Sequence, residues 1–251
     1  MIVVLLSILF IFGVCVGSFL NVVIYRLNNG FSPLKGRSFC PKCKHQLAWF
    51  DNIPLLSFVV LRGKCRYCQS PISRQYPLVE LATGIITLLI FNLQFTIYNQ
   101  FSIFNLLIAY CFLVIFVSDL RYGIIPDEVV VFGVVVALVK LLFERQALLP
   151  FILAGLGGLG FFGLLVWITK GKGMGWGDVK LAFLIGLLLG WQKGIAALYL
   201  SFLTGAIVGV ILILVGKKRF GQTVPFGPFL VICTYIAMYF GEKIIKIWPG
   251  L

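Results

Sequence analysis

Long apolar runs constrain this chain more than any other feature of its sequence. The first, Ile2–Tyr25, is nearly unbroken and long enough to span a bilayer. The chain is 61% hydrophobic and 12% charged, whereas soluble domains are about half apolar and about a quarter charged. We therefore expect an all-α polytopic membrane protein with about eight transmembrane helices. After the first, the runs lie at Leu78–Leu93, Phe101–Ser118, Val129–Phe143, Pro150–Thr169, Val179–Trp191, Ile195–Gly216 and Pro225–Ile245.

These runs divide the chain into three expected parts. Residues 1–25 form a first transmembrane helix, residues 26–77 a polar, cysteine-rich domain, and residues 78–251 the remaining spans. The first run lacks the basic start and the small-residue cleavage site of a signal peptide. We expect a retained helix whose start lies outside the cytoplasm. The run Val179–Trp191 is short for a crossing, so we expect it either to recruit part of the preceding glycine-rich stretch or to tilt little.

The basic residues predict an orientation. If the polar region after the first span is cytoplasmic, 16 of the 21 Lys and Arg residues lie inside, as the positive-inside rule requires. The net charge of +13 could instead indicate nucleic-acid binding, but no recognition motif accompanies it. We expect the lipid bilayer, and no nucleic acid, as a partner.

Two Cys-x-x-Cys motifs occupy the polar region. Cys40 and Cys43 form the first, Cys65 and Cys68 form the second, and 21 residues separate the two motifs. Four thiolates at this spacing are typical of a tetrahedral Zn²⁺ site. A disulfide framework needs an oxidising compartment, against the predicted orientation, and a thioredoxin-like pair needs a βαβ context. His45 could replace one cysteine, but four thiols already fill the shell, so we expect a closed, structural zinc site.

The stretch Gly171–Asp178 places four glycines in alternation before an apolar run. Interior glycines disfavour helix, so we expect a loop or an unwound turn here. Asp178 then has two interpretations. It could be an N-cap that satisfies free N–H groups, or a functional carboxylate at the mouth of a membrane helix, where charge is costly.

Asp119 closes the third predicted span. It could be an interfacial carboxylate near Arg121, whereas Asp127, after Pro126, is interpreted as a helix N-cap. Under the predicted orientation, Asp119 and Asp178 both fall at cytoplasmic helix ends, so they can face each other. Two carboxylates in a partly dry site cannot both ionise easily, which is the machinery of an aspartic protease. The pair titrates as a unit, so the acid and the base are not assigned.

Other catalytic machinery is not apparent in the sequence. It contains no Walker A run, no nucleophile elbow and no histidine-based metal motif. The single histidine, His45, lies in the cysteine region and cannot serve a nucleophile within the membrane helices.

Several further motifs match one family. Through these motifs the chain resembles the bacterial type IV prepilin peptidases. Members of that family are bifunctional leader peptidase/N-methyltransferases and belong to the membrane-embedded GxGD aspartic proteases. The matching motifs run from the first span to the last: Gly17-Ser-Phe-Leu-Asn21, the paired Cys-x-x-Cys, Asp51-Asn-Ile-Pro54, Leu61-Arg-Gly-Lys-Cys65, Tyr76-Pro-Leu-Val-Glu80, Asp119 with Pro126-Asp127, Gly175-Trp-Gly-Asp178-Val-Lys and Pro225-Phe-Gly-Pro228.

The resemblance implies an activity and a location. Asp119 and Asp178 would be the catalytic pair. The substrates would be type IV prepilins and pseudopilins, whose short basic leader is cut after a glycine at the cytoplasmic face of the bacterial inner membrane. The cysteine domain would take part in methylating the new N-terminus from S-adenosylmethionine. Gly63 and Lys64 match positions linked to methylation. No Rossmann-like glycine fingerprint is present, so the methyl-donor site stays open.

Two kinds of alternative remain. One is a related enzyme, either a peptidase without methylation or a GxGD protease with other membrane substrates. The other is a zinc-stabilised transporter or scaffold in which the two aspartates form a cation or proton path. Cleavage of an added prepilin would support a peptidase, and flux in proteoliposomes would support a transporter.

Overall fold

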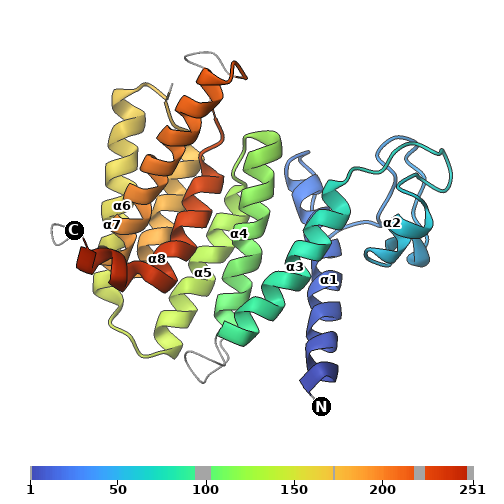
Figure 1. Ribbon diagram of the computed structural model, residues 1–251, viewed down its shortest axis with the longest axis horizontal. Helices are drawn as coiled ribbons and strands as arrows, with labels where there is room; N and C mark the ends of the chain where they lie inside the picture. The colour runs from blue at the N-terminus through green and yellow to red at the C-terminus, as the bar shows by residue number, and fades with distance from the viewer. Residues whose placement is uncertain (1, 94–102, 172, 218–223, 248–251) are drawn as a thin grey trace. The chain divides into compact units, whose positions relative to one another are not determined.

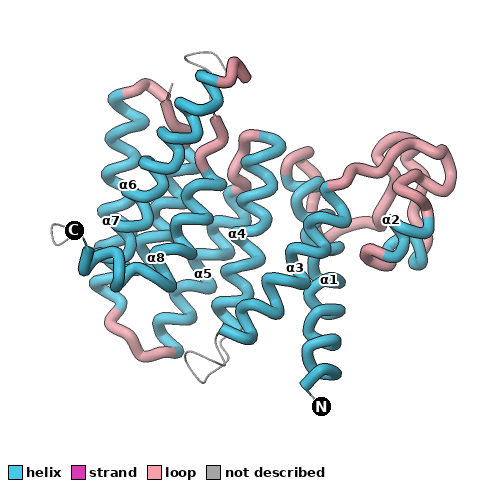
Figure 2. The backbone as a smooth tube through the Cα atoms, in the orientation of Figure 1, coloured by secondary structure: helices cyan, strands magenta, loops and turns pink. Residues whose placement is uncertain are grey.

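The computed structural model describes residues 2–93, 103–171, 173–217 and 224–247. Within these ranges the regular secondary structure is helical, as predicted, and Figure 2 shows loops as the only other feature of the backbone. Figure 1 labels the α-helices, and together with one short 3-10 helix they make up the described elements in chain order. They are α1 (Ile2–Leu27), the 3-10 helix η1 (Trp49–Asn52), α2 (Leu56–Val60), α3 (Gln75–Leu93), α4 (Ile103–Tyr122), α5 (Asp127–Phe143), α6 (Leu148–Ile168), α7 (Trp176–Leu214) and α8 (Gly227–Ile247).

The chain forms two compact units, Met1–Val114 and Ile115–Leu251. The first contains α1 to α3, the cysteine region and the first part of α4. The second contains the last turns of α4 and α5 to α8. Both predicted aspartates lie in the second unit, and all four cysteines of the Cys-x-x-Cys motifs lie in the first. The boundaries predicted at residues 25 and 77 are not tested by this division and stay a prediction.

Six of the described helices are long and apolar enough to cross a membrane, namely α1, α3, α4, α6, α7 and α8. Eight crossings were expected, and two helices explain the difference. With 17 residues, α5 is about 26 Å long, slightly less than the roughly 30 Å of a bilayer core. With 39 residues, α7 is about twice as long as one crossing needs.

A sharp break at Gly190 divides α7. Its backbone angles, φ 71° and ψ −168°, are not helical. A side-chain carbon at Gly194 would lie 3.7 Å from the Cα of Gly186, although residues eight apart along a helix are about 12 Å apart. The chain therefore folds back at Gly190, and α7 contains the predicted run Val179–Trp191 and all but the last two residues of the run Ile195–Gly216.

In the first unit, α1 and α3 approach closely through small residues. A side-chain carbon at Gly17 would lie 2.7 Å from the Cα of Glu80, and one at Gly84 would lie 2.7 Å from both Phe10 and Val14. Closely packed helices of this kind depend on small residues at the contact. The Asn21 amide adds a polar link across this seam by donating to the Tyr76 carbonyl at 3.0 Å.

In the second unit, the first half of α7 forms the core. Leu181, Leu184 and Ile185 are fully buried there. The neighbours come so close that a side-chain carbon at Gly158 of α6 would lie 2.9 Å from the Ala182 carbonyl oxygen. Because the interior of this unit begins directly after the start of α7, the side chains of its first turn lie at the edge of a closely packed bundle.

Candidate functional site

Asp119 lies in the last turn of α4, and its carboxylate accepts the first N–H group of another helix. The side chain is buried, and its Oδ2 accepts a hydrogen bond from the Gly227 N–H at 2.7 Å. Gly227 is the first residue of α8, where backbone N–H groups have no partner within the helix. A side-chain carbon at Gly227 would lie 2.8 Å from this oxygen. Only glycine therefore admits the carboxylate at this distance.

Asp178 is the third residue of α7 and is also buried. Its Oδ2 accepts the Gly175 N–H at 3.1 Å, which is the half of a capping box that a carboxylate at the third helical position supplies, with Gly175 as the N-cap. Asp178 thus stabilises the helix start from inside the helix, and not as the N-cap residue itself. The predicted loop is confirmed for Gly173–Gly175, whereas the last three residues of the Gly171–Asp178 stretch already belong to α7.

Two contacts hold the start of α7 against the turn that follows α4. A side-chain carbon at Gly177 would lie 2.9 Å from the Cβ of Ile125, so glycine allows this close approach. Lys180 Nζ pairs with Asp127 Oδ2 at 2.6 Å. These contacts flank Asp178 and lie within one turn and a short loop of Asp119. The two carboxylates are close enough for the charge of Asp119 to act on Asp178.

The interpretation of Asp127 as a helix N-cap was wrong. The N-cap is Pro126, and Asp127 is the first residue of α5. Its side chain extends toward α7 and pairs with Lys180. The sequence pattern could place a helix start here to within one residue. It could not show that a lysine 53 positions further on would compete for the carboxylate.

An aromatic cluster supports the Gly227 N–H group. The ring of Phe226 lies 5.2 Å from that of Phe202 and 6.3 Å from those of Phe162 and Phe229, measured between centroids. These contacts fix the backbone immediately before the donor. The motif Pro225–Pro228 was recognised in the sequence without a role. Its Gly-Pro pair at a helix start was the available signal, since proline favours the first helical turn.

The four cysteines of the Cys-x-x-Cys motifs come together in the first unit. The sulfur atoms of Cys40, Cys43, Cys65 and Cys68 all lie within 4.8 Å of one another, and the Cys40 and Cys68 sulfurs are 3.9 Å apart. A tetrahedral zinc with Zn–S bonds of about 2.3 Å requires sulfurs roughly 3.8 Å apart. The arrangement fits zinc, and among the described residues the cluster contains no histidine.

Both cysteine motifs have the same backbone. In each, the N–H of the first cysteine, Cys40 or Cys65, donates to the carbonyl five residues later. Its own carbonyl accepts from the residue four later, and all four bonds measure 2.8–2.9 Å. That later residue, Lys44 or Gln69, has a positive φ of 60° or 57°. We call the pair Cys40–Lys44 and Cys65–Gln69 the two knuckles.

Ser70 favours the thiolate form of one of the four cysteines, Cys68. The Ser70 hydroxyl lies 3.1 Å from the Cys68 sulfur. Hydrogen bonds from Ser70, first from its side chain and then from its backbone, lower the pKa of the Cys68 thiol to about 6. A thiolate is the form that binds a metal. His45, in contrast, stacks against Tyr67 with ring centroids 3.7 Å apart, consistent with a shell of four thiols.

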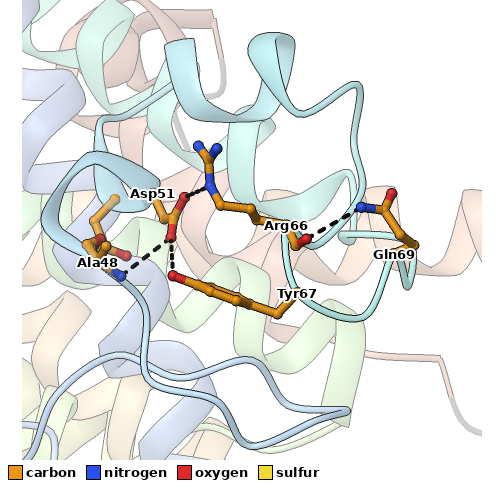
Figure 3. A network of polar contacts seen from close by, with 6 residues as sticks. Ala48, Asp51, Arg66, Tyr67 and Gln69 are labelled. Carbon is orange, nitrogen blue, oxygen red and sulfur yellow. Dashed lines mark hydrogen bonds and ion pairs between the residues drawn. The ribbon is translucent and has the colours of Figure 1, made fainter.

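Asp51 connects the segment between the knuckles to the second knuckle (Figure 3). Its Oδ1 pairs with Arg66 Nε at 2.8 Å, and its Oδ2 accepts from the Tyr67 hydroxyl and the Ala48 N–H, both at 3.3 Å. Partial burial, and then the charge of Asp51, raise the pKa of Tyr67, so that the phenol stays a donor. The sequence showed Asp51 within a matching motif but gave it no role, because Arg66 and Tyr67 lie 15 and 16 positions away.

Gly63 and Lys64 lie immediately before the second knuckle. Gly63 has a φ of 70°, and a side-chain carbon there would lie 3.2 Å from the Phe58 ring. Lys64 is exposed. The positive φ at position 63 is enough to explain a glycine there. The link of both residues to methylation stays a prediction.

Comparison with known proteins identifies the family to which this chain belongs. Residues 11–95 match the bacterial peptidase A24 N-terminal domain, and residues 106–210 match the type IV leader peptidase family. A prepilin leader peptidase/N-methyltransferase of Aeromonas hydrophila is 34% identical, over 96% of this chain and 92% of the relative. The chain belongs to the type IV leader peptidase family. The resemblance seen in the sequence is thereby confirmed.

Other relatives in the type IV leader peptidase family agree. Prepilin leader peptidase/N-methyltransferases of Pseudomonas aeruginosa and Legionella pneumophila are 33% and 34% identical, over 93% and 96% of this chain and 90% and 93% of the relatives. No solved structure gave a significant match. The N-terminal match includes all four knuckle cysteines, and the type IV leader peptidase match includes Asp119 and Asp178.

Proposed function

We propose that this member of the type IV leader peptidase family removes the leader of type IV prepilins and pseudopilins, with Asp119 and Asp178 as the catalytic pair. The single observation that carries the proposal is the convergence of these two buried carboxylates at one end of the second unit. The names of the relatives support the substrate class. The cut would follow a glycine, at the cytoplasmic face of the bacterial inner membrane.

The pair would act as a general base and a general acid. The ionised carboxylate takes a proton from a water molecule whose oxygen bonds to the scissile carbonyl carbon, and the protonated carboxyl donates to the carbonyl oxygen. Collapse of this tetrahedral adduct breaks the C–N bond, and the leaving amine takes up a proton from the pair. The Gly227 and Gly175 N–H groups each hold one carboxylate oxygen, which fixes both carboxylates before the substrate arrives.

We also propose that the chain methylates the new N-terminus, as the names of its relatives indicate for them. S-adenosylmethionine, when bound, supplies the methyl group. Cys40, Cys43, Cys65 and Cys68 would hold a structural zinc, since four thiolates leave no open position for substrate. The zinc would order the loop, and Asp51 would fix the segment between the knuckles.

The proposed architecture has three parts in one membrane. A first span (residues 1–25) starts outside, a cytoplasmic zinc domain (residues 26–77) follows, and a membrane peptidase domain (residues 78–251) completes the chain. The excess of Lys and Arg in the loops assigned to the inside supports this orientation. It places the aspartate pair on the side where the basic leader of a prepilin lies.

The decisive experiment measures the mass of the product. Detergent-solubilised protein is incubated with a prepilin and S-adenosylmethionine, and the intact product is weighed. We expect loss of the leader and gain of one methyl group. Asp119→Ala and Asp178→Ala should abolish cleavage, whereas Asp127→Ala, at the same end of the unit but exposed and paired with Lys180, should retain it.

Each alternative result has a distinct meaning. Substantial cleavage by Asp119→Ala or Asp178→Ala would refute the pair. Loss of the leader without methylation would leave a peptidase alone. No cleavage by folded, unmodified protein on a prepilin that a relative accepts would favour the transport interpretation of the two aspartates.

A further inference from the structure

The short helix α2 exposes an unusually apolar face. Leu56, Val59 and Val60 are 64%, 71% and 72% exposed. They are spaced at i, i+3 and i+4, so they lie on one face of the helix. Trp49, at the start of η1, is 77% exposed and adds an aromatic ring to the same loop. No described residue of the chain covers this face.

The opposite side of α2 is held by the loop itself. Phe58 packs against Gly63, whose added side-chain carbon would lie 3.2 Å from the ring. The Gly63 N–H donates to the Phe58 carbonyl at 2.9 Å. The apolar face is therefore presented by a fixed turn, and the exposure of Leu56, Val59 and Val60 is a property of the folded loop.

A hydrogen bond holds the start of α2 against the candidate membrane spans α1 and α3. The Leu55 N–H, immediately before α2, donates to Glu80 Oε2 at 2.8 Å. Glu80 lies against α1 at the level of Ser18, because a side-chain carbon at the adjacent Gly17 would lie 2.7 Å from the Glu80 Cα. Both Ser18 and Glu80 lie within candidate membrane spans, Val3–Leu27 and Gln75–Asn92.

The helix lengths give the depth of this contact. The span Val3–Leu27 has 25 residues and is about 37 Å long, roughly 7 Å more than the bilayer core. Ser18 precedes Leu27 by nine residues, or about 13 Å. Even if all of the roughly 7 Å by which the span exceeds the bilayer core projected beyond it at the Leu27 end, Ser18 would lie about 6 Å inside the hydrocarbon core. The N-terminal end of α2 is tied to a carboxylate at this level.

The charges near α2 suit a phospholipid leaflet. Arg62 and Lys64 are exposed and follow the helix directly. Residues 26–77 contain nine Lys and Arg residues and one acidic residue, Asp51, which is paired with Arg66. Basic side chains flanking an apolar helix face, with a nearby tryptophan, are typical of helices that lie in the membrane interface. Anionic lipids of the cytoplasmic leaflet attract such segments.

We propose that α2 is an interfacial helix. Its Leu56, Val59 and Val60 face inserts among the acyl chains of the cytoplasmic leaflet, and Arg62 and Lys64 contact the lipid phosphates. The occupant of the apolar face is lipid. This inference rests on the membrane placement of α1 and α3 proposed above, and not on the peptidase chemistry.

Photolabelling of the whole protein tests it. The chain is reconstituted in nanodiscs of phosphatidylethanolamine and phosphatidylglycerol that contain a phosphatidylglycerol with a diazirine near the glycerol end of one acyl chain. After irradiation, adducts are mapped by peptide mass spectrometry. We expect adducts on Leu56–Val60 and on Phe19, which is exposed on α1 beside Ser18. The exposed Lys42–Lys44 of the first knuckle should take none.

The controls separate the possible failures. Adducts on Phe19 without adducts on α2 would overturn the proposal and indicate that protein covers the face. Absence of adducts on Phe19 would overturn the membrane placement of α1, and the proposal with it. Val59→Asp should remove the α2 adducts while bound zinc is unchanged, and Ser32→Asp, an exposed position outside both knuckles, should retain them. Full labelling of α2 in Val59→Asp would also contradict the proposal.

Discussion

At the residue scale, two backbone N–H groups position the two carboxylates. Gly227 and Gly175 each donate to an Oδ2 atom, at 2.7 Å and 3.1 Å. The first contact joins residues 108 positions apart, whereas the second lies within one helix start. Position 227 requires glycine, because a side chain there would occupy the space of the Asp119 carboxylate.

Gly227→Ala should therefore impair cleavage without preventing membrane insertion. The added carbon would lie 2.8 Å from Asp119 Oδ2, so the carboxylate or α8 must move. A displacement of about 1 Å at a catalytic group costs roughly 100-fold in rate, and we expect a loss of this order in single-turnover cleavage. Gly209→Ala is the matched control, because nothing lies within 4 Å of its added carbon. Equal rates for the two variants would contradict the positioning role.

Local sequence signals identified the charged side chains of the site but not their partners. Asp119 and Asp178 could be selected because carboxylates at the ends of apolar runs are rare and costly. The four cysteines could be selected by their spacing, since each knuckle is a local turn. Gly227 could not be assigned, because its role depends on how α8 packs against α4. The same limit applies to Asp127, whose partner Lys180 belongs to another helix.

At the element scale, the knuckles and the break in α7 organise the two units. The knuckles bring together two turns separated by 20 residues. The break at Gly190 lets a single uninterrupted stretch of the chain form two packed helices. Periodicity predicted two apolar runs in this region but not the conformation between them. Glycine at the end of an apolar run is compatible with a loop, a kink or a continued helix.

Removal of zinc should loosen the cysteine loop and affect methylation more than cleavage. Cys40 is buried in the thiol cluster, so Cys40→Ser should remove bound zinc and increase the protease sensitivity of residues 26–77. Metal analysis and limited proteolysis measure both effects, and a chelator should reproduce them. Cys15→Ser, at an exposed cysteine of α1, should retain zinc. Equal loss of both activities at unchanged protein level would refute the separation of roles.

Gly190→Ala should destabilise the second unit. The position has φ 71° and ψ −168°, a region almost restricted to glycine, where other residues cost about 1–3 kcal/mol. An added carbon would also lie 3.3 Å from the Phe151 ring. We expect a lower midpoint of thermal unfolding in detergent than for the unmodified chain. Gly160→Ala, in a helix with nothing within 4 Å, should leave the midpoint nearly unchanged.

At the scale of the whole molecule, the contact between Gly177 and Ile125 decides how the chain crosses the membrane. It places the end of α4 and the start of α7 on the same side. Between them lie α5 and α6, and α6 is long enough to cross. A return to the same side requires a second crossing, which must be α5 in spite of its 17 residues. A slightly short helix can be accommodated by local thinning of the bilayer.

This topology predicts opposite accessibility for two loops. Arg145, after α5, should face the outside, and Lys170, after α6, should face the cytoplasm. Arg145→Cys and Lys170→Cys variants are treated in intact spheroplasts with a membrane-impermeant maleimide. We expect labelling at position 145 alone, and labelling at position 170 only after the cells are opened. The reverse pattern would contradict the proposed orientation, and equal accessibility of the two positions would mean that only one of α5 and α6 was placed correctly.

The hydrogen bond from Gly227 to Asp119 also has a consequence for biosynthesis. Ribosomes deliver the chain from its N-terminus, so both aspartates enter the membrane before the donor at the start of α8 exists. A nascent chain that ends before Pro225 contains the reactive side chains but not the group that orients Asp119. The enzyme would therefore stay inactive until α8 is inserted, and chains that end before α8 would be unable to cut neighbouring proteins during their own synthesis.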